Sequence, residues 1–120
     1  MGRGDTVEDE YKVTLRRIAV RDDRYIDALL QGDHANATLA GLDDRSHALI
    51  RIAALVASDA APPAYMNCVE AALRAGASYD EIVGVLVAVL PLVGIARAVS
   101  AAPNLGLAVG YDVSEALEVA

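Results

Sequence analysis

The 120-residue sequence contains no Trp, no Phe and a single cysteine, Cys68. One cysteine cannot form a disulfide within the chain, which excludes a small scaffold held together by internal disulfides. The sequence also has no recognisable signal peptide, so we expect a reducing, cytoplasmic location.

Positive charge is also scarce. Ten Lys and Arg residues face seventeen Asp and Glu residues, which gives a formal net charge of −7. A nucleic-acid partner would require a basic surface that neutralises phosphates, and this composition argues against one.

The longest stretch without charge runs from Ile82 to Ala96 and stops at Arg97. A membrane-spanning helix needs about 20 apolar residues, and Gly and Pro residues interrupt this shorter run. We therefore interpret it as a core helix, kinked or broken at Pro91, and expect no membrane association.

What the sequence does contain is aliphatic side chains, since apolar residues make up 55% of the chain. A domain of 120 residues buries only a modest core. We therefore expect a homo-oligomer, in which copies of the chain bury the excess apolar surface between them.

Apolar residues recur at helical spacing along most of the chain, and no segment alternates as a strand does. The pattern predicts an all-α single domain over 1–120, a compact bundle of about six helices. Its expected parts are N-terminal covering helices over 6–32, a core over 42–111 and an acidic C-terminal tail over 112–120. The segment 33–41 is expected to be a polar loop, and a short apolar helix punctuated by Pro103 and Gly106 is expected near the end of the core.

Helix boundaries are marked by capping residues. Thr6 with Asp9 predicts the start of the first helix, and Gly32 is expected to end the second helix. Asp43 predicts an N-cap, while Pro62 with Pro63 predicts a helix start. Gly76 should end that helix. Ser78 followed by Glu81 has the spacing of a capping box and predicts the start of the helix that contains the charge-free run.

The helix that begins after Asp43 is apolar except along one narrow edge. His47 and Arg51 lie one turn apart on this edge. They are candidate binding residues, but a surface edge or an ion pair at a subunit contact explains them at least as well.

The helix that begins at Pro62 places Tyr65 and Cys68 on one face with Val69 and Ala72. The opposite face is polar, and Glu70 precedes Arg74 by four residues, the favourable order for a helical ion pair. We expect the Cys68 face to turn inward.

Four stretches match a known pattern: Leu42–Ile50, the run Ala71-Ala72-Leu73-x-x-Gly76-Ala77, Asp80-Glu81-Ile82, and Gly94 with its small neighbours. In these the chain resembles the carboxymuconolactone decarboxylase family, which includes the alkylhydroperoxidase-D-like proteins. The resemblance implies an alkylhydroperoxidase-D-like helical bundle, assembly as a trimer or hexamer, and lyase or peroxidase ancestry.

The chemical residues of that family do not match. In the register set by Ala71 to Ala77, the family histidine falls on Cys68 and the two cysteines of its Cys-x-x-Cys motif fall on Ala61 and Ala64. The family glutamate falls on Ala48 or Leu49. In the decarboxylase branch a second histidine falls on Ala88. Dithiol peroxidase activity is therefore not expected.

Three hypotheses for function remain. Cys68 could act in a lyase or a one-cysteine peroxidase, although a buried structural cysteine is the more common situation. A small apolar pocket lined by Tyr65 and Cys68 could hold an organic ligand. The chain could instead be a structural oligomer or an accessory subunit of a partner enzyme. No cofactor is implied, and no metal site is expected because the two histidines and Cys68 lie on different elements.

A pocket with converging polar groups would favour the first two hypotheses. A filled core at Cys68 would favour the third.

Overall fold

The computed structural model describes residues 9–119, and over this range it contains eight helices and no strand. The all-α prediction is therefore confirmed. The predicted helix start at Thr6, the first residues of the covering helices and the last residue of the tail lie outside the described residues. The chain divides into two compact units between Gly41 and Leu42.

The first unit contains α2 (Glu10–Ala19), α3 (Asp23–Leu29) and α4 (Asp33–Ala40). The Tyr25 hydroxyl donates to the Thr14 hydroxyl at 3.5 Å, which links α3 to α2. The Arg17 guanidinium lies over the Tyr25 ring, 5.3 Å from its centre. No residue of these three helices is fully buried.

The prediction of a polar loop over 33–41 is wrong, because α4 occupies this segment. Its alanines favour a helix, and Asp33 in the first turn complements the helix dipole. Gly32 caps the start of α4 instead of ending the preceding helix, since α3 already ends at Leu29. The Asn36 amide reaches back to the Leu29 carbonyl at 2.9 Å and holds the two short helices together.

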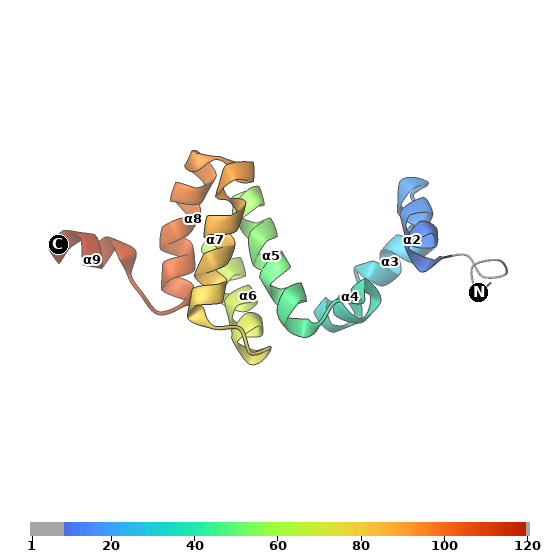
Figure 1. Ribbon diagram of the computed structural model, residues 1–120, viewed down its shortest axis with the longest axis horizontal. Helices are drawn as coiled ribbons and strands as arrows, with labels where there is room; N and C mark the ends of the chain where they lie inside the picture. The colour runs from blue at the N-terminus through green and yellow to red at the C-terminus, as the bar shows by residue number, and fades with distance from the viewer. Residues whose placement is uncertain (1–8, 120) are drawn as a thin grey trace. The chain divides into compact units, whose positions relative to one another are not determined.

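The second unit is built from five helices: α5 (Asp44–Ser58), α6 (Pro62–Arg74), α7 (Tyr79–Val93), α8 (Ile95–Ala108) and α9 (Val113–Val119). The first four form a bundle (Figure 1) in which α5 and α8 each pack against both α6 and α7. The short helix α9 contacts α8.

The core of the bundle is aliphatic apart from one tyrosine and one cysteine. Each of the four bundle helices contributes to it, because each carries apolar residues three and four positions apart. The buried cluster consists of Ala48, Ile52, Val56, Tyr65, Cys68, Val69, Ala72, Ala77, Ile82, Ala101 and Leu105.

Neither proline in the last part of the core ends a helix. Helix α7 continues through Pro91 to Val93, and the chain turns at Gly94, whose φ of +91° suits a residue without a side chain. Helix α8 likewise runs through Pro103 and has fourteen residues, so the prediction of a short, punctuated helix is wrong. Each proline costs one backbone hydrogen bond, which the surrounding packing outweighs.

The end of the chain also differs from the prediction. The acidic tail contains α9, whose first turn is capped by the Asp112 carboxylate accepting from the Glu115 backbone N–H at 3.0 Å. Together with α4, this helix raises the number of helices above the predicted six.

Within residues 9–119, no helix combines the length and apolarity needed to cross a bilayer.

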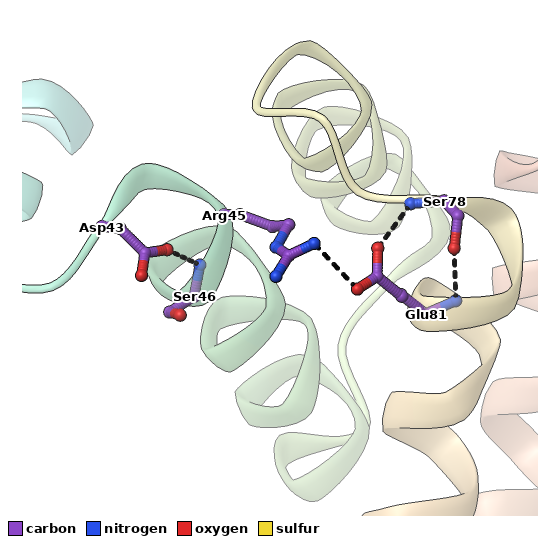
Figure 2. Close-up of polar contacts among 5 residues, drawn as sticks. All are labelled: Asp43, Arg45, Ser46, Ser78 and Glu81. Atoms are coloured by element: carbon purple, nitrogen blue, oxygen red, sulfur yellow. Dashed lines mark hydrogen bonds and ion pairs between the residues drawn. The ribbon is translucent and has the colours of Figure 1, made fainter.

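The predicted capping box at the start of α7 is confirmed, and Figure 2 shows that it does more than cap the helix. The Glu81 backbone N–H donates to the Ser78 hydroxyl at 3.0 Å, and the Ser78 backbone N–H donates to Glu81 Oε1 at 2.9 Å. The other carboxylate oxygen, Oε2, pairs with the Arg45 guanidinium at 3.0 Å. Glu81 thus ties the first turn of α7 to the first turn of α5.

Asp43 caps α5 as predicted, accepting from the Ser46 backbone N–H at 2.7 Å. That hydrogen bond lowers the pKa of Asp43. The pKa of Glu81 is also lowered, first by the hydrogen bond from the Ser78 backbone and then by the charge of Arg45. Both carboxyl groups therefore favour the ionised form in the folded chain.

We predict that Glu81→Gln makes stability less sensitive to acid. Because the pKa of Glu81 is lower in the folded state than its ordinary 4.5, its contribution is complete above about pH 5 and is lost as the pH falls through the folded-state pKa. Urea midpoints at pH 7 and pH 3 should therefore differ less for Glu81→Gln than for the wild type.

The variant Arg45→Met is the matched comparison, because it removes the ion pair and leaves the capping box intact. Its loss of stability at pH 7 should be smaller than that of Glu81→Gln. If the difference in urea midpoint between wild type and Glu81→Gln were the same at pH 7 and pH 3, the stabilising role of the ionised Glu81 side chain would be contradicted.

Candidate functional site

Helix α6 positions the candidate residues Tyr65 and Cys68. It begins after Ala61, with Pro62 and Pro63 in the first positions, where the missing N–H groups cost no hydrogen bond. Gly76 follows the end of the helix, as predicted. The inner face is formed by Tyr65, Cys68, Val69 and Ala72, all of which are buried. The predicted inward orientation of the Cys68 face is therefore confirmed.

The polar face of α6 points to solvent. Asn67, Glu70 and Arg74 are exposed, and Glu70 forms the predicted ion pair with Arg74. Pairs of this kind at exposed positions contribute only about 0.3–0.5 kcal/mol. The polar face therefore serves mainly to fix which side of α6 turns inward.

Cys68 is only 9% exposed and belongs to the continuous apolar cluster of the bundle. Its helical neighbours Val69 and Ala72 have no exposed surface at all. Nucleophilic and peroxidatic cysteines need both access and a thiolate stabilised by positive charge or a hydrogen bond. These surroundings provide packing contacts, which are what a structural cysteine requires.

Tyr65 is the largest fully buried side chain of the second unit, with 1% of its surface exposed. Burial raises the pKa of its hydroxyl, and the negative charge of Asp59 raises that pKa further. Asp59 also accepts a hydrogen bond from the Ser100 hydroxyl at 2.9 Å, which connects the end of α5 to α8. The tyrosine therefore stays protonated at neutral pH and acts as an apolar filler with one polar end.

The polar edge predicted for α5 differs from the observed one. His47 is buried and Arg51 is half-buried, whereas the apolar residue Ile50 is exposed. The helix is rotated so that His47 lies beside the core residue Ala48, and both His47 and Arg51 have interaction partners. An engaged, buried histidine next to core residues is more often a satisfied structural group than a ligand.

The residues at which the resemblance would place the family's cysteines, glutamate and second histidine differ in their exposure to solvent. Ala61 is exposed at the start of α6, Ala64 is half-buried, and Ala48 is buried in the core. Ala88 is exposed on α7. These alanines, and Leu49 as the alternative to Ala48 for the glutamate, carry no group that can transfer a proton or an electron pair.

Sequence reasoning missed two tertiary polar links. Arg45 with Glu81 and Asp59 with Ser100 join residues far apart in the chain. The sequence predicts the role of Glu81 in the capping box, but no local pattern indicates its ion pair with Arg45. Both links connect helix ends to neighbouring helices, so they position the bundle and do not form a reactive group.

Two further features of the described part of the chain concern possible binding sites. Among residues 9–119, no cluster of three or more His, Cys, Asp or Glu side chains could hold a metal ion. An open depression beside α9 is lined by Gly110, Tyr111, Asp112, Glu115 and Ala116. Its carboxylate Asp112 is already engaged in capping α9.

Comparisons with known proteins add no further assignment. No family model, no curated protein and no solved structure matches this chain.

We predict that Cys68 reacts slowly with thiol reagents in the native protein, at least about 100-fold more slowly than in urea, because labelling requires opening of the core. Cys68→Ala should cost about 1 kcal/mol, the loss of one sulfur from a packed site. Cys68→His should cost more, about 2–3 kcal/mol, because it places a polar ring among aliphatic side chains.

Urea melts of the two variants test this, with Met66→Ala as the control. Met66 lies on the same helix but is 53% exposed, so its truncation should change stability by less than about 0.5 kcal/mol. Rapid labelling at pH 7 together with a Cys68→His variant as stable as the wild type would contradict the prediction and reveal an open polar site.

Proposed function

We propose that this chain is a homo-oligomeric structural protein, built on a scaffold related to the carboxymuconolactone decarboxylase family but without that family's chemistry. The observation that carries the proposal is the burial of Cys68, at the position of the family histidine, in a closed aliphatic cluster. In this proposal Cys68 and Tyr65 are core residues, and the binding capacity of the chain lies on its outer surface.

Two features support assembly as the function. The first is the excess of apolar side chains that the bundle leaves exposed, among them Ile50, Val87, Leu92, Ile95 and Val99. Large apolar patches on a soluble chain commonly mark protein interfaces. The second is the resemblance, which implies trimers or hexamers.

The competing hypothesis is an enzyme of the lyase or one-cysteine peroxidase type that uses Cys68. Such an enzyme needs a thiolate that reaches its substrate and a nearby group that accepts or donates the proton. The neighbours of Cys68 in the buried cluster are Val69, Ala72 and other apolar side chains, together with Tyr65. These surroundings favour the structural proposal over the enzymatic one, and over a ligand pocket at the same place.

We predict that the protein reduces hydrogen peroxide and organic hydroperoxides at the background rate, with either a dithiol or a monothiol reductant. The physical reason is that Cys68 is enclosed and that alanines stand at the two cysteine positions of the family. The assay compares wild type with Cys68→Ala at equal concentration. Steady-state turnover that disappears in Cys68→Ala would overturn the proposal and identify Cys68 as a peroxidatic residue.

A further inference from the structure

Helix α7 is apolar around its whole circumference between Ile82 and Val93, yet only Ile82 is fully buried. A helix with this composition normally lies inside a core. Its inner side, with Val85, Val89 and Val93, packs against the bundle. The opposite side therefore has no apolar cover within the second unit.

The exposed side of α7 carries a regular row of large residues, named here the α7 stripe. It consists of Tyr79, Val83, Val87 and Leu90, all of which are exposed. They follow one another at spacings of four, four and three residues. Side chains at these spacings share one face of a helix and can pack along the length of a second helix.

We propose that the α7 stripe pairs with the α7 stripe of a second copy of this chain, with the two helices antiparallel. This inference rests on the proposed function and specifies the surface and the orientation through which assembly occurs.

The distribution of charge favours a second copy of this chain as the partner that covers the α7 stripe. Two copies of a chain with a net charge of −7 repel each other over most of their surfaces. From Ile82 to Ala96 there is no ionisable side chain, so two copies approach there without bringing like charges together. An anionic membrane surface is a poor alternative, because interfacial helices bind it through Lys and Arg beside their apolar face.

Charge also selects the orientation. Asp80 lies in the first turn of α7 and Arg97 lies in the first turn of α8, just beyond the other end of α7. Both are exposed. Antiparallel pairing brings the Asp80 end of one copy toward the Arg97 end of the other and also opposes the helix dipoles favourably. Parallel pairing would bring Asp80 against Asp80.

The available surface suits a dimer of moderate affinity. A fifteen-residue helix is about 22 Å long, and paired helices lie about 8–10 Å apart. One such pairing covers only part of the about 800 Å² that each partner buries in a standard interface. Leu92, Ile95 and Val99, around the turn between α7 and α8, are further exposed apolar residues of the second unit.

The first experiment measures molar mass by light scattering after size exclusion, at micromolar concentrations. The wild type should form an even multiple of 12.5 kDa, because a two-fold contact pairs copies, either alone as a dimer or within a hexamer. Val87→Glu should weaken association at least about 100-fold, because it places two unpaired charges in the contact. Met66→Glu, at a similarly exposed apolar site on α6, should leave the mass unchanged.

The outcomes separate the two proposals. A monomeric wild type would overturn the proposed function and this inference together. A wild-type oligomer that Val87→Glu leaves intact, or a trimer, would overturn only the pairing through α7. Circular dichroism verifies that each variant is folded.

Disulfide trapping tests the orientation even where Val87→Glu fails to fold. In an antiparallel pair centred near Leu86 and Val87, Val87→Cys should form a dimer on mild oxidation. Val83→Cys alone should not, because the two cysteines lie about 10 Å apart along the axis. The double variant Val83→Cys with Leu90→Cys should form a cross-linked dimer, as Val87→Cys does. The wild type, which lacks the introduced cysteines, serves as the control. Cross-linking of Val83→Cys alone would establish a parallel pair and overturn the proposed orientation.

Discussion

The structure of the second unit depends on a helix that is apolar on every side. Helix α7 contributes Ile82 to the buried cluster and packs against both α5 and α8, so removing it would open the bundle. Its start is fixed by the Ser78–Glu81 capping box and by the ion pair from Glu81 to Arg45. Water does not solvate the remaining sides of such a helix favourably, because burying aliphatic surface contributes about 25 cal/mol per Å². One element thus organises the core and also leaves the apolar surface that the proposed pairing would cover.

The packing of the aliphatic bundle also determines the position of Cys68. The polar residues of α6 gather on one side, so the side with Tyr65 and Cys68 must face the aliphatic bundle. Once the core closes around it, the thiol contributes through packing. The resemblance to the carboxymuconolactone decarboxylase family implies a histidine at this position, and the proposed function assigns Cys68 a packing role there. His47 fits the same account, as a buried and engaged group beside Ala48.

Local signals in the sequence predicted local structure well. The caps at Asp43 and Ser78, the proline start of α6 and its buried face all follow from side chains within one or two turns. The failures occur where the local signal is weak or where packing decides. Helix α4 depends on weak propensities that polar residues and a flanking glycine obscure, and α8 continues through Pro103 because the packing of the bundle outweighs the lost hydrogen bond. The orientation of α5 depends on which helices surround it. The links from Arg45 to Glu81 and from Asp59 to Ser100 span long sequence separations, so no local pattern indicates them.

The most direct test of the account is amide hydrogen exchange measured at low and high protein concentration. If α7 is completed by a second copy, peptides that cover 83–92 should exchange more slowly as the concentration rises and association increases. Peptides that cover the core face of α6, over 65–72, should show little change. Equal exchange of the α7 peptides at both concentrations, while the molar mass rises, would contradict the account and place the contact elsewhere on the chain.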